Sequence, residues 1–357
     1  MLSEASKKRY SAFWQNDATD RFLVYLSAPD GSKSPAPDFS GLTEDEVNWK
    51  VRMDFEFRVL REKERILHTN YYCDGFPTIF TDFGPGSLAA CIGGNFQVAK
   101  DTVWFDRNPI IKNWDSYPKI KIYRNSEMWQ ATDTYTKMLC EAGKGIFYTS
   151  IADIGGTLDI AASLRGTSEL LLDMYDNPEQ VKELVKKIQP VWKEAFFHLK
   201  SITDSYQDGV TSWMPIWCEK AYFPLQCDFS AMLSADMFEE FVLPDLIYQT
   251  EYLDHSIYHL DGPGELQHVD HLFSIPRLNA IQWIPGAGNA DVADECWFEL
   301  YQKIQAGGKG LVLFVNRPEL LENLLKHISP KGVYIYVTDT DDYTARQLKE
   351  LVEKTKI

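Results

Sequence analysis

The chain has 357 residues, of which 45% are hydrophobic and 25% charged, and its formal net charge at pH 7 is −16. This composition is typical of a globular protein, and the length suffices for one large α/β barrel or two ordinary domains. The acidic balance argues against nucleic acids and anionic membranes as partners, because both would be repelled at long range.

The ends and the cysteines indicate a protein that stays in the cytoplasm. The basic residues near the N-terminus precede no apolar core of the kind a secretory signal needs. No apolar run approaches the roughly 20 residues that span a bilayer. The six cysteines are scattered without a C-x-x-C pair, which favours reduced thiols over a disulfide framework.

Short buried runs bounded by turn residues alternate with amphipathic helical patterns along the chain. The expected strands are Arg21–Leu26, Thr78–Thr81, Gly145–Ala152, Val210–Ile216, Ser256–His259, Asn279–Trp283, Leu311–Val315 and Val333–Val337. The expected helices are Glu44–His68, Ser126–Ala142, Thr167–Tyr175, Pro178–Ser201, Ser234–Leu253, Asp291–Ala306, Pro318–His327 and Tyr343–Lys354. Thr43 and Glu46 form a capping box before the first of these helices.

This alternation predicts an α/β fold with a parallel sheet, and eight strands close a single (β/α)₈ TIM barrel over residues 1–357. A doubly wound open sheet is the alternative, but no phosphate-binding glycine pattern follows the first strand. The stretch 83–125, rich in glycine and aromatic residues, is an insertion that we expect to cap the barrel mouth.

The segment from Ser256 to Gly288 places chemistry where a strand meets its loop. His259 and Asp261 are two residues apart, so an extended strand sends both side chains to one face. Gly262 lets the chain turn away immediately afterwards. In barrels the carboxyl ends of the strands carry the active site, so this pair is a candidate metal site or acid–base pair. Hydrogen-bonded packing of His259 is the plainer alternative.

Other polar residues stand at expected strand ends and would converge on the same mouth, and an acidic cluster there suits proton transfer or metal binding. Asp82 and Asp153 are candidate catalytic groups, although each could instead cap the turn that follows it. Glu219 is a candidate ligand or a solvated loop carboxylate. The candidate substrate-binding residues are Trp217, Tyr222, Tyr258, Gln282 and Trp283, and Trp104 and Trp213 add to the aromatic lining.

The chain resembles the uroporphyrinogen decarboxylase superfamily over nearly its whole length. Phe80-Thr81-Asp82 stands where the decarboxylase has its F-S-D aspartate, and Ile154–Gly166 is similar to its glycine-led strand-to-helix segment. The helix-pair sequence LLLDMYDNPEQVKELV is also close to the family's, and the run DFSAMLSADMFEEFVLP within Pro224–Pro244 is the most specific match. The resemblance implies a (β/α)₈ barrel with its site at the carboxyl-terminal mouth.

The departures from the decarboxylase matter more than the matches. Its arginine-bearing loop corresponds to Leu26–Gly31, LSAPDG, which has no arginine. Its active-site tyrosine falls at Ala162, and its histidine-containing segment falls at Tyr336–Thr340, YVTDT. Without these groups we expect no decarboxylation of uroporphyrinogen, although Asp82 is retained.

The other branch of the superfamily comprises corrinoid-linked methyltransferases, which bind zinc through an H-x-C-G motif and a later cysteine. Here His259-x-Asp261-Gly262 keeps the histidine and glycine but replaces the cysteine with aspartate. Nitrogen and carboxylate ligands also bind zinc, with Glu219 or Cys227 as further ligands. Such harder ligands leave the metal more Lewis-acidic, which favours activation of an oxygen over a soft thiolate.

Three hypotheses follow from the sequence. The first is a methyltransferase-like enzyme that acts on a small methylated substrate or on a methyl-corrinoid held by a partner protein, with zinc near His259. The second is a decarboxylase of a smaller substrate, with Asp82 as proton donor. The third is a non-catalytic barrel that binds a corrinoid or aromatic ligand. A homodimer is among the expected assemblies.

Overall fold

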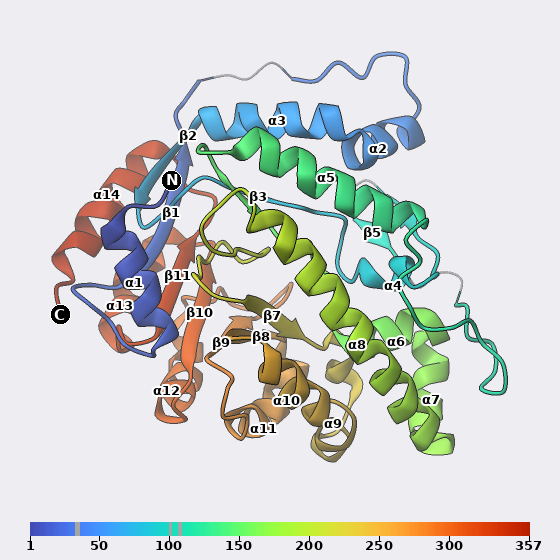
Figure 1. The fold of residues 1–357 in the computed structure, drawn as a ribbon. Helices are drawn as coiled ribbons and strands as arrows, with labels where there is room; N and C mark the ends of the chain where they lie inside the picture. The colour runs from blue at the N-terminus through green and yellow to red at the C-terminus, as the bar shows by residue number, and fades with distance from the viewer. Residues whose placement is uncertain (33–35, 100–101, 106–108) are drawn as a thin grey trace.

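The computed structural model describes residues 1–32, 36–99, 102–105 and 109–357. It is an α/β fold in which helices surround a set of central strands (Figure 1). The strands are β1 (Leu23–Pro29), β2 (Thr69–Cys73), β3 (Thr78–Phe80), β4 (Gln97–Val98), β5 (Val103–Trp104), β6 (Tyr148–Ser150), β7 (Tyr222–Gln226), β8 (His255–Asp261), β9 (Ala280–Ile284), β10 (Gly310–Val315) and β11 (Val333–Val337).

The helices follow the same alternation along the chain. The α-helices are α1 (Glu4–Trp14), α2 (Glu44–Met53), α3 (Phe55–Leu67), α4 (Leu88–Cys91), α5 (Glu127–Gly143), α6 (Thr157–Arg165), α7 (Thr167–Asp176), α8 (Pro178–Thr203), α9 (Ala235–Phe241), α10 (Leu243–Tyr252), α11 (Val269–Phe273), α12 (Phe298–Ala306), α13 (Leu321–His327) and α14 (Asp342–Lys354). Short 3₁₀ helices are η1 (Asp228–Met232), η2 (Pro263–His268), η3 (Glu295–Trp297) and η4 (Pro318–Leu320). No helix in the described ranges is both long and apolar enough to cross a membrane.

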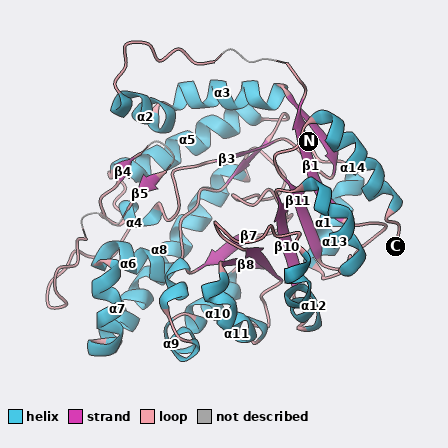
Figure 2. Ribbon diagram, turned by 180° about the vertical axis from the view of Figure 1, so that it is seen from behind, coloured by secondary structure: helices cyan, strands magenta, loops and turns pink. Residues whose placement is uncertain are grey.

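The main sheet has seven strands in the order β2-β1-β11-β10-β9-β8-β7, and β2 is the antiparallel member. A separate parallel pair, β3 and β6, completes the central strands, and β4 and β5 form a small antiparallel hairpin. Figure 2 shows the strands from behind, with the helices around them. The predicted α/β class and parallel pairing are therefore confirmed.

One expected strand is wrong. Val210–Ile216 is not a strand, because Val210 makes an isolated antiparallel bridge to Cys218 and the chain doubles back between them. Met214 and Ile216 are buried in the doubled-back segment, and the carbonyl of Pro215 accepts a hydrogen bond of 2.8 Å from the Tyr334 hydroxyl. The strand in this region is β7, which sequence reasoning missed because it contains Pro224. A proline fits there because β7 is an edge strand of the sheet.

The expected helix Glu44–His68 is divided at Asp54 into α2 and α3. The Asp54 side chain accepts a hydrogen bond of 3.0 Å from the Phe57 backbone, so it caps α3 in the middle of the expected helix. The capping box at Thr43 and Glu46 is confirmed, with both reciprocal hydrogen bonds present.

The strands bury two faces. On β8, Ile257 packs into one hydrophobic cluster, whereas Tyr258 and Leu260 pack into the other, larger one beneath the helices. The smaller cluster also contains Tyr25, Tyr334 and Tyr222, and it is covered by Tyr10, Phe13 and Trp14 of α1. Helix α1 thus lies beside the start of β7, where the rings of Tyr222 and Trp14 pack at a tilt with centroids 4.6 Å apart. Helix α1 does not cover the opposite, carboxyl-terminal ends of the strands, where the candidate site lies.

Candidate metal centre

His259 and Asp261 lie on the same face of β8, as their spacing predicted. Asp228, at the start of η1, joins them, and the ligand atoms of the three side chains all lie within 4.8 Å of one another. Strand register explains the meeting: Gln226 of β7 pairs with His259, so Asp228, two residues further on, comes level with Asp261. Tetrahedral ligand atoms about 2.1 Å from a zinc ion lie roughly 3.4 Å from one another, so these three side chains would bind zinc after moving slightly closer together.

The imidazole of His259 is oriented by Gln282 on the neighbouring strand β9. The Oε1 atom of Gln282 lies 2.7 Å from Nδ1 of His259, and Gln282 is fully buried. When Nδ1 carries the proton and donates it to this oxygen, Nε2 keeps its lone pair for a metal ion. The Trp213 ring meets the imidazole edge to face, with centroids 5.0 Å apart.

Asp228 is held by a second carboxylate. The side chain of Asp159, in the first turn of α6, accepts hydrogen bonds from the backbone N–H groups of Asp228 (3.2 Å) and Phe229 (2.8 Å). Burial and the nearby charge of Asp228 raise the pKa of Asp159 to about 7. Desolvation also raises the pKa of Asp228, opposed by His259 and reinforced by the charge of Asp261.

Two further acidic groups belong to this neighbourhood. Burial raises the pKa of Asp153 to about 7, and the charges of Asp228 and Asp82 add to the effect. Burial likewise raises the pKa of Glu265 to about 9, although its carboxylate accepts a hydrogen bond of 3.3 Å from the backbone N–H of Asp261. Asp153 therefore titrates close to neutral pH, whereas Glu265 stays protonated there. Strongly shifted pKa values of this kind are common at functional sites.

Asp82 has structural partners of its own. Its carboxylate accepts a hydrogen bond of 2.8 Å from the Gly84 backbone, so it caps the following turn, as the plainer alternative held. Its other oxygen forms an ion pair of 2.5 Å with Arg52 of α2. This arginine supplies positive charge that the loop Leu26–Gly31 lacks. Asp82 is nevertheless near enough to Asp153 to influence its pKa.

Several predicted residues lie elsewhere. Glu219 and Trp217 line a groove with Lys7 of α1, before β7 begins, and Tyr222 starts that strand, so all three lie at the end of the sheet opposite His259. The reason is the misassigned strand: Glu219 follows the doubled-back segment and not a strand end. Cys227 lies in the main hydrophobic core, where burial raises its thiol pKa well above the usual value.

Tyr258 and Trp283 also face the main core and not the mouth. The Tyr258 hydroxyl lies 3.5 Å from the Glu265 carboxylate, and Trp283 packs against Trp297 with ring centroids 5.0 Å apart. Gln282 alone among the five predicted substrate-binding residues touches His259. Asp228, Asp159 and Glu265 were missed. If β7 had been recognised as a strand, Asp228 would have been placed beside its carboxyl end. Because successive side chains of a strand point to opposite faces, Asp228 and Cys227 would then have been expected on opposite faces.

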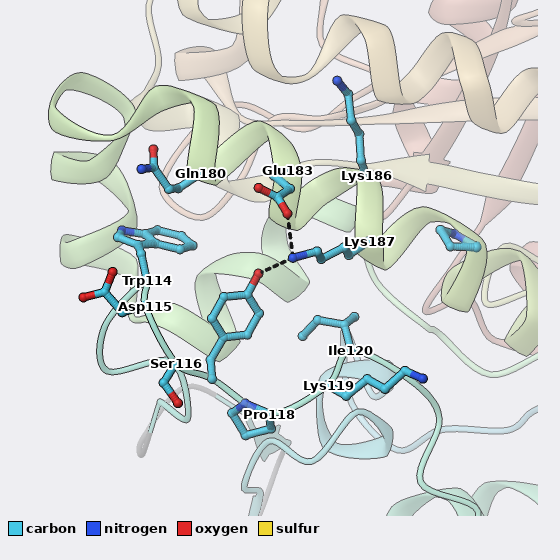
Figure 3. A pocket seen from close by; sticks show the side chains of 12 residues that line it. Trp114, Asp115, Ser116, Pro118, Lys119, Ile120, Gln180, Glu183, Lys186 and Lys187 are labelled. Carbon is cyan, nitrogen blue, oxygen red and sulfur yellow. Dashed lines mark hydrogen bonds and ion pairs between the residues drawn. The ribbon is translucent and has the colours of Figure 1, made fainter.

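A cleft of about 310 Å³ opens beside Asp228. Its walls include Asp159 and Ala162 of α6 together with Trp104 and Phe105 of the insertion, so part of the stretch 83–125 lies at the site. A larger groove of about 730 Å³ lies elsewhere, between residues 114–120 and α8. In that groove Lys187 forms an ion pair with Glu183 (Figure 3) and donates a hydrogen bond to the Tyr117 hydroxyl.

Fold and site together define an α/β protein with an imidazole and several carboxylates at the carboxyl ends of its parallel strands. The fold is similar to that of a methyltransferase from Methanosarcina mazei, with a TM-score of 0.60 over 98% of each chain and 10% sequence identity. At this identity the likeness concerns the fold. No protein-family model matches the sequence, and no curated protein matches it significantly.

Proposed function

We propose that this chain is a metal-dependent enzyme of the methyltransferase type, built on a (β/α)₈ barrel, with Asp228, His259 and Asp261 as zinc ligands. The observation that carries the proposal is the convergence of three ligand atoms within 4.8 Å at the carboxyl ends of neighbouring parallel strands. The similar fold of a methyltransferase supports the reaction class, and β1, β3, β6 and β7 to β11 supply eight strands for a barrel.

The residues fit zinc in two further respects. His259 has its Nδ1 engaged by Gln282, which leaves Nε2 for coordination. Asp228 is fixed by the two backbone hydrogen bonds to Asp159, so its carboxylate is directed before any ion arrives. The ligand set contains no thiolate, because Cys227 is turned into the core. A bound zinc ion would act there as a Lewis acid toward an oxygen of the substrate.

The protein's own groups then manage substrate and protons. The cleft beside Asp228 accommodates a small molecule against Trp104 and Phe105. Asp153, with its pKa of about 7, takes up the proton that an acceptor hydroxyl releases when its oxygen bonds to the methyl carbon, and it releases that proton to solvent afterwards. The electron pair of the broken bond stays with the group that gave up the methyl.

A methyl-corrinoid bound to a partner protein is the donor that we propose. Its support is the partial H-x-C-G motif at His259-x-Asp261-Gly262 and the resemblance to the uroporphyrinogen decarboxylase superfamily, which includes corrinoid-linked methyltransferases and is most specific at Pro224–Pro244, the segment that carries Asp228. The test is incubation of zinc-loaded protein with methylcobalamin and a panel of small alcohols and thiols, following the loss of the cobalt–methyl absorbance. We expect zinc-dependent demethylation that His259→Ala abolishes. Equal rates with parent, variant and no protein would refute the proposal.

A further inference from the structure

Two buried N–H groups beside His259 have no partner. The Nε2 atom of Gln282 and the Nε1 atom of Trp213 are shielded from solvent, and neither has a hydrogen-bond acceptor among the described residues. A buried donor without a partner destabilises the fold, so such a group calls for an explanation. Here two of them flank one imidazole.

The surroundings explain why these donors stay free. Gln282 uses its Oε1 atom for Nδ1 of His259, which directs its NH₂ group away from that bond. If His259 binds metal through Nε2, Nδ1 must carry the proton, and this fixes the amide with its nitrogen outward. The Trp213 ring meets the same imidazole edge to face. The Gln282 donor is therefore directed by its contact with His259, and the second donor belongs to a ring that packs against the same imidazole.

The same face is within reach of solvent. The His259 and Trp213 side chains are only half-buried, whereas Gln282 is fully buried beneath them. A rotation of Trp213 would open the two N–H groups to a molecule that approaches the imidazole. The Trp213 ring itself provides an apolar wall for the rest of that molecule.

We propose that Trp213 and Gln282 form a two-donor subsite that binds a neutral oxygen acceptor of the substrate, such as a carbonyl, ether or hydroxyl oxygen, next to His259. Both donors are uncharged, and one oxygen with two lone pairs satisfies two N–H groups. An anionic head group is disfavoured, because Asp228 and Asp261 lie beside the same imidazole. The inference rests on the proposed function and adds the class of its substrate.

Acetone is a suitable probe, because it is a neutral oxygen acceptor without a donor of its own. Zinc-loaded protein with ¹⁵N-labelled tryptophan is titrated with acetone while the Trp213 indole N–H resonance is followed, assigned by its loss in Trp213→Phe. We expect a saturable downfield shift. Gln282→Glu keeps the oxygen that faces His259 but removes the second donor, and it should weaken acetone binding about tenfold. Gln226→Glu adds the same charge on β7, on the other side of β8, and should weaken acetone binding much less.

Three results would overturn the inference. They are a shift that stays linear in acetone concentration, equal affinities of the parent and Gln282→Glu, and tighter saturable binding of acetate than of acetone. Zinc content is measured on every sample. Absence of zinc from the parent counts against the proposed function, whereas normal zinc with unchanged acetone binding in Gln282→Glu counts against the subsite alone.

Discussion

The carboxylate of Asp159 accepts a hydrogen bond of 2.8 Å from the backbone N–H of Phe229, and it accepts another from the preceding residue, Asp228. One side chain of α6 thereby fixes the backbone that presents a candidate ligand. Asp159→Ala should lower zinc affinity by about 10- to 100-fold, as the loss of a residue that supports a metal ligand by hydrogen bonding typically does. Asp159→Asn keeps an accepting oxygen and should recover part of the affinity. Competition with a chromophoric chelator measures both, and unchanged affinity in Asp159→Ala would contradict this role.

Asp153 should make the metal-free protein less stable as the pH rises. Its pKa of about 7 in the folded protein exceeds the value near 3.9 of an unfolded chain. The stability it contributes is therefore complete below pH 3.9 and is lost as the pH rises through 7, by at most about 4 kcal/mol. Asp153→Asn should lose less stability than the parent between pH 4.5 and pH 8. Urea unfolding in the presence of chelator measures the difference, and parallel pH profiles would refute it.

Asp261→Cys should tighten zinc binding by about tenfold or more. The exchange would create an H-x-C-G sequence like that of the methyltransferases that the segment resembles, and zinc favours thiolate ligands. Asp270→Cys is the control, since Asp270 is an exposed residue paired with Lys303 outside the site. Zinc affinity equal in the two cysteine variants would show that position 261 does not face the metal.

Trp217 should matter for stability and not for the site. It is buried beside α1, donates a hydrogen bond of 2.7 Å to the carbonyl of Asp208, and accepts one of 3.0 Å from Trp14 at its own carbonyl. Trp217→Ala should cost about 3 to 5 kcal/mol of unfolding free energy. Its zinc content at low temperature should equal that of the parent. Loss of zinc from the folded variant would contradict the placement of Trp217 at the far end of the sheet.

The sequence predicts those parts of the fold that depend on local patterns. The short buried runs Ser256–His259 and Leu311–Val315 mark strands that the structure confirms, and the side-chain period of two places His259 and Asp261 on one face. The capping box at Thr43 is equally local. These features depend on residues a few positions apart, so no knowledge of tertiary contacts is needed.

The rest depended on long-range packing. Val210–Ile216 has the composition of a buried strand but fills space between other elements, where Pro215 meets Tyr334 of β11. Pro224 made β7 hard to recognise, because proline is found within strands mainly at the edge of a sheet. Whether a strand lies at an edge is a property of the tertiary fold and cannot be read from the local sequence. Because Val210–Ile216 was predicted as the strand in place of β7, Glu219, Trp217 and Tyr222 were expected at the carboxyl ends of the strands, whereas they lie at the opposite end of the sheet. For the same reason Asp228 was not recognised as a candidate ligand. The hydrogen bond between Asp159 and the Asp228 backbone could not be predicted, because it depends on the packing of α6 against η1, which are far apart in the sequence.

The central claim is that Asp228, His259 and Asp261 bind a metal ion, and metal analysis tests it most directly. Protein purified without chelator, with its fold checked by circular dichroism, is assayed for zinc beside His259→Ala, Asp228→Ala and the distant control Glu219→Ala. The account predicts close to one zinc per chain in the parent and in Glu219→Ala, and a loss of bound zinc in the other two. A parent that binds no zinc, or a folded His259→Ala that retains it fully, would contradict the account.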